Sequence, residues 1–260
     1  MNLFTQFYKS IISPKSMASF RFQGIGKTIL YVFLISVLAA LPVIFFLVSL
    51  AASALSGFDQ SLKKDFPDFQ IANGELQSRV KNPVEVKRGS YMFVFDSTGA
   101  YGQKEMEEKQ NAVGLLKNQF VLVTGGQSQS YTYNLAGNVN LTKEDVAGFA
   151  DQVSAMKPLI IGILSVIVYL FSSASKFIEV TILALIGLLF KNAAGKRMNF
   201  KQLWVISAYA VTLSTLFFAI TGVLQIHVIS AALVNWAIHL IMLFLSLKEV
   251  PGKPAGKKQA

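Results

Sequence analysis

The amino-acid sequence predicts an α-helical integral membrane protein, with about four transmembrane helices and one small α+β extracytoplasmic domain. Three observations predict this class. The chain is 53% hydrophobic and only 15% charged, whereas soluble domains are about 25% charged. Long apolar runs without charge alternate with polar segments, and basic residues gather beside these runs. A lipid bilayer is therefore the solvent that this composition fits.

The net charge of +10 lies in short segments next to the apolar runs. The orientation-setting basic residues are Arg21, Lys27, Lys191, Lys196, Arg197 and Lys201. Under the positive-inside rule, the segments that carry them are cytoplasmic. Basic residues confined to short segments beside apolar runs do not form a folded face that could follow a phosphate backbone, so we expect no nucleic-acid partner. The chain has no cysteine, which excludes disulfides and thiolate chemistry.

Residues 1–27 are predicted to form a cytoplasmic amphipathic segment. Apolar residues recur there at helical spacing, namely Phe4, Phe7, Tyr8 and Ile11. This short helix is expected to stop at Ser13-Pro14, because the residue before a proline disfavours the helical conformation. It lies either on the inner membrane surface or against the transmembrane helices. Residues 28–56, with Pro42 as a kink, are the first predicted transmembrane helix.

Residues 57–157 lack long apolar runs and are predicted to form the extracytoplasmic α+β domain. Turn signals divide the segment, including the hairpin signal Asn73-Gly74 and a second turn at Gly137-Asn138. Strands are predicted where β-branched and aromatic residues gather, over 84–86, 91–95, 120–123 and 131–133. Helices are predicted over 103–116 and from Thr142, where Thr142-Lys143-Glu144-Asp145 resembles a capping box.

The second transmembrane helix is predicted over 158–190, with a polar break near 172–179. One helix of this length is about 50 Å long, which exceeds the hydrocarbon layer of about 30 Å. Two crossings, however, would place the basic loop 191–202 outside, so we expect one crossing and a cytoplasmic loop. Two further spans are predicted over 203–224 and 229–247, followed by a cytoplasmic basic tail over 248–260.

Five polar residues inside the predicted spans are candidates for an intramembrane site, namely Lys176, Glu179, Tyr209, Asn235 and His239. Lys176 and Glu179 are three residues apart on one helix face, so they can neutralise each other. Asn235 and His239 are four residues apart and share a face of the last span. Such residues bind a polar solute, relay protons or hydrogen-bond a neighbouring helix, and the last role is the commonest.

The motif Asp96-Ser97-Thr98-Gly99 follows a predicted strand in the extracytoplasmic domain. Aspartic proteases carry a similar loop, but two carboxylates share a proton there, and this chain has one copy. We therefore interpret Asp96, Thr98 and Gly99 as a turn in which the carboxylate accepts backbone hydrogen bonds.

Other signatures of chemistry are incomplete. Gly24-Ile25-Gly26-Lys27-Thr28 lacks the first glycine of a phosphate-binding loop, because Arg21 occupies that position. The two histidines, His227 and His239, are too few for a zinc site in a chain without cysteine. We expect no metal, no cofactor and no catalytic residues.

Several blocks resemble a family of polytopic membrane proteins of Gram-positive bacteria, the domain-of-unknown-function 1189 family. They are Ser13-Pro14-Lys15, the run from Phe20 to Thr28, Phe95-Asp96-Ser97-Thr98-Gly99, and the order of the spans. Some members of the family are named maltodextrin utilisation proteins, and the family is distantly similar to Yip1-type multi-span proteins. The resemblance implies a plasma-membrane protein linked to maltodextrin uptake, and it supplies no catalytic residues.

We expect a non-enzymatic accessory or sensory protein of the bacterial plasma membrane, associated with maltodextrin or oligosaccharide uptake. Its partners would be the lipid bilayer, a membrane protein such as a sugar-transporter subunit, and copies of itself. The alternative is a small-solute or proton-conducting transporter that acts as an oligomer, because four spans are few for a carrier. Its site would lie near Lys176, Glu179, Asn235 and His239.

Overall fold

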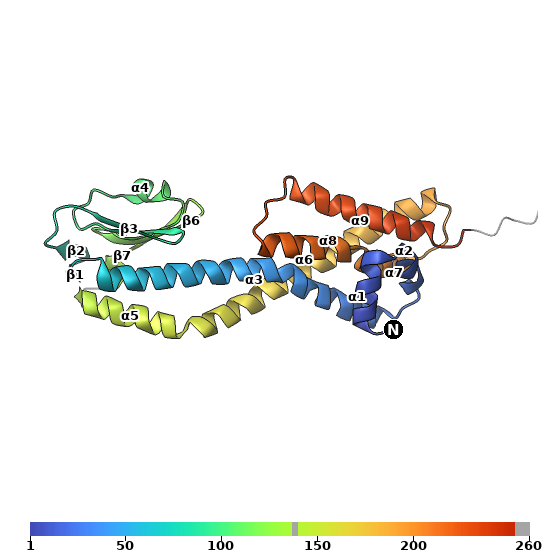
Figure 1. The fold of residues 1–260 in the computed structure, drawn as a ribbon, viewed down its shortest axis with the longest axis horizontal. Helices are drawn as coiled ribbons and strands as arrows, with labels where there is room; N and C mark the ends of the chain where they lie inside the picture. The colour runs from blue at the N-terminus through green and yellow to red at the C-terminus, as the bar shows by residue number, and fades with distance from the viewer. Residues whose placement is uncertain (137–139, 253–260) are drawn as a thin grey trace, which may run out of the picture. The chain divides into compact units, whose positions relative to one another are not determined.

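A computed structural model describes residues 1–136 and 140–252 (Figure 1). The chain divides into two compact units. The helical unit contains Met1–Phe46 and the chain from Ile163 onward, and the α+β unit contains Leu47–Gly162. The predicted turn at Gly137-Asn138 and residues 253–260 of the predicted basic tail lie outside the described residues.

The described helices long and apolar enough to cross a membrane are four: Ile25–Lys64, Lys157–Ala193, Phe200–Val223 and Ala231–Lys248. The first is α3, which continues through Pro42 without ending. The second is α6, a single helix that runs through the polar segment at 172–179. The fourth is α9.

The third of these apolar helices changes its hydrogen bonding at Val211, between α7 (Phe200–Ala210) and α8 (Thr212–Val223). The side chains of Ser214 and Thr215 both donate to the Val211 carbonyl, at 3.2 and 2.8 Å. Hydroxyl groups that bond back to the preceding turn in this way bend helices. The predicted span 203–224 is therefore two helical segments with a break at Val211.

The N-terminal segment forms α1 (Leu3–Ile12) and α2 (Pro14–Phe20). Ser13 ends the first helix and its side chain caps the second, with Pro14 at the first helical position. α1 packs against α7 and α8. Gln6 and Ser10 are buried there and Phe7 packs against the core, while Phe4 and Tyr8 of the predicted apolar stripe are exposed.

The α+β unit contains two sheets. A three-stranded sheet has the order β2-β1-β8, and a five-stranded sheet has the order β3-β4-β5-β6-β7, with β4 and β5 parallel and the other neighbours antiparallel. The strands are β1 (Phe69–Ala72), β2 (Glu75–Ser78), β3 (Val84–Arg88), β4 (Tyr91–Phe95), β5 (Ala112–Leu115), β6 (Gln119–Thr124), β7 (Gln127–Thr132) and β8 (Leu141–Thr142). A 3₁₀ turn, η1 (Tyr133–Ala136), follows β7. The predicted hairpin is confirmed, since Asn73 and Gly74 both have positive φ between β1 and β2.

The predicted helix over 103–116 is wrong in its second half. Only α4 (Gln103–Glu107) is helical, and Ala112–Leu115 is the central strand β5. Gln110 has a positive φ of 64°, which ends helical geometry ahead of the strand. All four residues of β5 are buried, so the strand lacks the alternation that identifies a half-buried strand.

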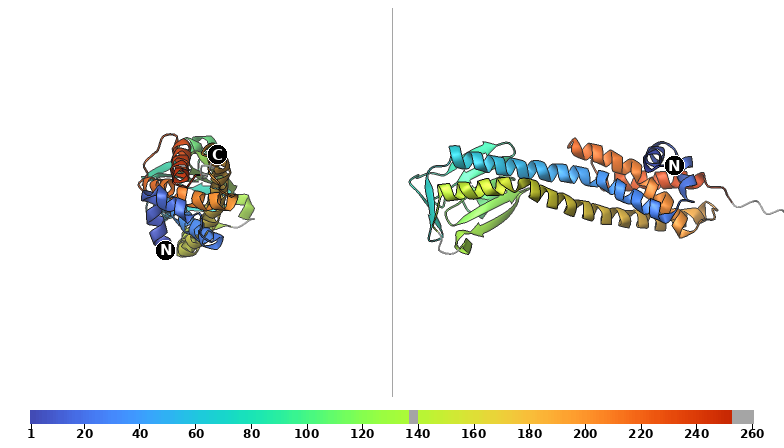
Figure 2. Two further views of the ribbon diagram at one scale, coloured as in Figure 1. Left: turned by 90° about the vertical axis from the view of Figure 1, so that its right-hand side faces the viewer. Right: turned by 90° about the horizontal axis from the view of Figure 1, so that it is seen from below.

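Both faces of the five-stranded sheet are covered (Figure 1). Phe93 and Phe95 of β4 belong to one core with Leu62 of α3, whereas Val94 belongs to a second core with Met106 of α4. The helix predicted from Thr142 is α5 (Lys143–Ala155), and its capping box joins Thr142 and Asp145. α5 lies beside the end of α3 (Figure 2), where Lys63 Nζ is 2.8 Å from Asp151 Oδ1.

Candidate functional site

A polar cluster joins three helices of the helical unit, with Glu179 of α6 at its centre. Lys176 Nζ on the same helix lies 2.5 Å from Glu179 Oε2. From α9, Asn235 Nδ2 donates to Glu179 Oε1 over 2.7 Å, and His239 Nδ1 lies 3.4 Å from the same oxygen. The side chains of Lys176 and Glu179 are only 11% and 15% exposed. We call Lys176, Glu179, Ser214, Asn235 and His239 the Glu179 cluster.

The cluster follows from helical periodicity. Residues three or four apart lie on one helix face, which places Lys176 beside Glu179 on α6 and Asn235 beside His239 on α9. The structure thus brings together four of the five predicted intramembrane residues. Because the opposite charges of Lys176 and Glu179 neutralise each other, burying each charge in an apolar environment costs less free energy.

Ser214 of α8 is a member of the cluster that the sequence analysis missed. Its hydroxyl forms a short hydrogen bond with His239 Nε2. The signal for it was weak, because Ser214 stands among other small hydroxyl residues and serine often bonds to its own helix backbone. The Ser214–His239–Glu179 order is the order of a serine hydrolase triad. Ser214 and His239 are, however, completely buried, so a substrate has no access to the hydroxyl.

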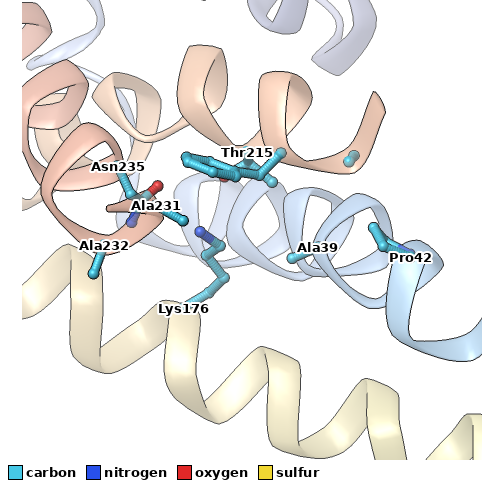
Figure 3. Close-up of a pocket in the computed structure, with 9 residues that line it drawn as sticks. Ala39, Pro42, Lys176, Thr215, Ala231, Ala232 and Asn235 are labelled. Carbon is cyan, nitrogen blue, oxygen red and sulfur yellow. The ribbon is translucent and has the colours of Figure 1, made fainter. Parts of the chain in front are cut away.

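Two cavities border Lys176. The first has a volume of about 310 Å³, and Figure 3 shows Lys176 pointing into it from α6, with Asn235 and Thr215 on the opposite wall. Ala39 and Pro42 of α3 form another side. The second cavity, of about 590 Å³, has mainly apolar walls. Ala39 and Lys176 line both cavities.

Tyr209, the fifth predicted intramembrane residue, belongs to a different network near the start of α3. Its hydroxyl donates to Gln6 Oε1 over 2.9 Å and accepts from Gln23 Nε2 over 2.5 Å. Tyr31 lies beside it, with ring centroids 4.2 Å apart, and bonds to Thr212 Oγ1 over 2.6 Å. The glutamines were not predicted here, because the sequence gives no sign that Gln6 of the amphipathic helix α1, or Gln23 of the segment between α2 and α3, faces inward.

The Asp96 motif has the geometry of a turn. Asp96 Oδ1 accepts from the Thr98 amide at 2.8 Å, the Thr98 hydroxyl at 2.6 Å and the Gly99 amide at 3.2 Å, and Oδ2 accepts from the Tyr101 amide at 2.7 Å. Burial alone would raise the pKa of the carboxyl, but the hydrogen bonds from Thr98, Tyr101 and Gly99 outweigh it and lower the pKa. Within the described residues, no hydrogen bond joins Asp96 to a second carboxylate.

Several of the orientation-setting basic residues also bond to backbone carbonyls. Lys191 Nζ donates to Met198 O over 2.5 Å, and Lys196 Nζ donates to Lys248 O and Val250 O at the end of α9. Arg21 donates to Ala18 O over 2.5 Å and Lys27 donates to Met1 O. Arg197 and Lys201 are exposed. The contacts of Arg21 and Lys196 are with carbonyls at the ends of α2 and α9, where basic side chains are stabilising because the unpaired carbonyls carry partial negative charge.

In the part of the chain that the structure describes, no group of three or more His, Asp and Glu side chains is placed to hold a metal ion. The fold and the Glu179 cluster together define a class: four apolar helices of membrane-spanning length, a separate α+β unit, and a buried ion-pair cluster among the helices.

The chain belongs to the family described as "Protein of unknown function (DUF1189)", whose model matches residues 4–247. No curated protein and no solved structure matches it significantly.

Proposed function

We propose that the protein is a non-enzymatic accessory or sensory protein of the plasma membrane. In this proposal the four apolar helices cross the bilayer, both chain ends are cytoplasmic, and the α+β unit is extracytoplasmic. That unit contacts a partner or a cell-envelope ligand, and the spans anchor or transmit the contact. A sugar-transporter subunit of a maltodextrin or oligosaccharide uptake system is the partner class that we propose.

One observation carries the proposal: a single helix, α3, supplies side chains to the cores of both units. Tyr31, Val32 and Ile35 belong to the core of the helical unit. Leu62 belongs to a core of the α+β unit, and Phe58 packs against it. A ligand that alters the packing of the α+β core therefore acts on the same helix that contributes to the membrane core. This continuity is what a sensory role requires.

Two further observations support a role without catalysis. The Glu179 carboxylate is engaged by Lys176 and Asn235, and Ser214 is inaccessible. The Asp96 carboxylate is occupied by four hydrogen bonds within its own turn. A catalytic group needs a free position for the reacting atom, and neither of these sites offers one.

The test is affinity purification of the full chain from native membranes in mild detergent, with and without maltodextrin, followed by mass spectrometry. We expect sugar-transporter subunits to co-purify. A matched variant, Gln129→Ala with Tyr131→Ala on the exposed strand β7, should reduce recovery, while Ala174→Leu on α6 should not. Equal recovery with every variant, or recovery of no partner, would contradict the proposal.

The second candidate is a small-solute or proton-conducting transporter that acts as an oligomer. The observation that favours it is the assembly of Lys176, Glu179, Asn235 and His239 beside two open cavities. Under this candidate, Glu179→Gln and His239→Ala abolish a transport phenotype. Under the accessory role, these changes are tolerated better than changes on the surface of the α+β unit.

A further inference from the structure

We infer that the two cavities on either side of Lys176 form one binding site for an anionic lipid. The lipid phosphate lies at the Lys176 ammonium group in the first cavity, hydroxyl groups of the headgroup face the acceptor oxygens of Asn235 and Thr215, and an acyl chain occupies the second cavity. This inference goes beyond the proposed accessory role. It rests on the proposed membrane placement of the helices and not on the function of the α+β unit.

The polar end of the site has hydrogen-bonding capacity that the protein does not use. An ammonium group has three donors, and among the described residues Lys176 Nζ has one acceptor, Glu179 Oε2. Asn235 donates its amide nitrogen to Glu179, which leaves its amide oxygen as an acceptor, and Thr215 donates to the Val211 carbonyl, so its oxygen is also an acceptor. A phosphodiester has no proton to give to these two oxygens, so the phosphate binds at the Lys176 ammonium group, and the two acceptors suit hydroxyl groups of the headgroup, such as those of phosphatidylglycerol.

The charges favour an anion next to Lys176. The Glu179 carboxylate is contacted by Lys176, Asn235 and the nearby His239, and the Lys176 side chain points into the first cavity (Figure 3). In an apolar cavity, a charge at contact distance interacts far more strongly than it does in water. A negatively charged phosphate oxygen at Lys176 is therefore stabilised more strongly than a neutral acceptor.

The other end of the site is mainly apolar. Most walls of the second cavity are aliphatic and aromatic side chains of α3, α6 and α9, including Val43, Ile167, Phe171, Ile178 and Trp236, and its polar members besides Lys176 are Ser172, Ser175 and Glu179. Lys176 and Ala39 border both cavities, so the ammonium group stands where polar and apolar walls meet. A ligand that fills both cavities must be amphipathic, and a soluble anion would leave the larger cavity without a partner.

The depth of the site suits the headgroup of the outer leaflet. Asn235 lies four residues after the start of α9, which is about 6 Å along the helix axis, whereas Lys176 is about 22 Å from Lys191 at the basic end. In a hydrocarbon layer of about 30 Å, both positions fall in the half opposite the basic loop.

The test uses the full chain purified in a non-ionic detergent, with an equimolar mixture of phosphatidylglycerol and phosphatidylcholine, and native mass spectrometry to count bound lipids. We expect the unmodified chain to prefer phosphatidylglycerol by about tenfold, which corresponds to about 1.4 kcal/mol. Lys176→Gln should abolish this preference. Lys201→Gln, which removes the same charge from an exposed position, should leave it unchanged.

Two further variants keep the test decisive if Lys176→Gln fails to fold. Ala39→Leu fills the wall shared by both cavities and should reduce binding of both lipids, while Ala174→Leu on an exposed face of α6 should not. Glu179→Gln removes the carboxylate that competes with phosphate, so it should maintain or strengthen the preference. A purely structural role for the ion pair predicts the opposite result for Glu179→Gln.

Three results would overturn the inference. They are an equal affinity of the unmodified chain for both lipids, an unchanged preference in folded Lys176→Gln, and complete displacement of the lipid by millimolar glycerol 3-phosphate. The last would identify a site for a soluble phosphate. None of these results bears on the partner of the α+β unit, which affinity purification tests separately.

Discussion

Asn235 on α9 donates a hydrogen bond of 2.7 Å to Glu179 on α6, and this bond joins two helices through residues that lie 56 positions apart in the sequence. We predict that Asn235→Ala lowers the free energy of unfolding by about 1 kcal/mol, a usual value for a polar contact between membrane helices. Thermal unfolding of the purified chain in detergent measures the change. A double-mutant cycle with Glu179→Ala, which removes the acceptor, should give a coupling energy of similar size.

Asn235→Asp is the informative companion variant. It places a second carboxylate beside Glu179, so it should destabilise the chain more than Asn235→Ala does at neutral pH, because like charges in a buried site repel. Equal melting temperatures for the two variants would show that Glu179 and Asn235 do not interact in solution.

The ring of Phe93 leaves no room for a side chain at Gly57 of α3, inside the α+β unit. A Cβ atom added at Gly57 would lie 2.5 Å from the ring of Phe93, whereas one at Gly148 on α5 meets nothing within 4 Å. We predict that Gly57→Ala destabilises the unit by about 1–3 kcal/mol, as overpacking does. Gly148→Ala should stabilise it by up to about 1 kcal/mol, because alanine favours helices. Urea titrations compare the two, and a stabilising Gly57→Ala would contradict the close packing.

Asp96 predicts a pH dependence of the α+β unit. The hydrogen bonds in its turn lower the pKa of the folded state below the unfolded value of about 3.9. The stabilisation from the ionised carboxylate is therefore complete above that value and is lost as the pH falls through the folded-state pKa. Asp96→Asn should cost about 2 kcal/mol at pH 7, and the difference from the unmodified chain should shrink at pH 3. Urea unfolding followed by circular dichroism at pH 7, 5 and 3 measures this, and a pH-independent difference would argue against it.

The absence of cysteine allows a clean test of the proposed topology. Gln129→Cys places a thiol on the exposed strand β7, and Asn192→Cys places one at the exposed end of α6. We predict that a membrane-impermeant maleimide labels Gln129→Cys in intact cells and labels Asn192→Cys only after permeabilisation. The reverse pattern would invert the orientation, and labelling of both in intact cells would show that the basic loop is not cytoplasmic.

Short-range periodicity made the Glu179 cluster predictable. Lys176 and Glu179 are three residues apart and Asn235 and His239 are four apart, so each pair shares a helix face whatever the rest of the fold. That the two pairs meet each other depends on how α6 and α9 pack, which the local sequence does not encode. Ser214 shows the same limit, because its contact with His239 depends on α8 lying beside α9.

Two other features could not be predicted from local sequence patterns. β5 has no polar alternation because one face packs toward Leu62 of α3 and the other toward Met106 of α4, so its sequence does not identify a strand. In α1, the spacing of Phe4, Phe7, Tyr8 and Ile11 predicted an amphipathic helix on the membrane surface or against the spans, but it did not indicate that Gln6 and Ser10 are buried. Tyrosine hydroxyls from other helices satisfy these polar groups, and a sequence window of ten residues contains no sign of them.

The hydrogen bond between Tyr209 and Gln6 joins residues 203 positions apart. Gln6 also donates to Gln23, in the segment just before α3, so this short-range contact can form before α7 is made. The contact with Tyr209, by contrast, requires α7. Complete docking of α1 therefore follows the synthesis of α7.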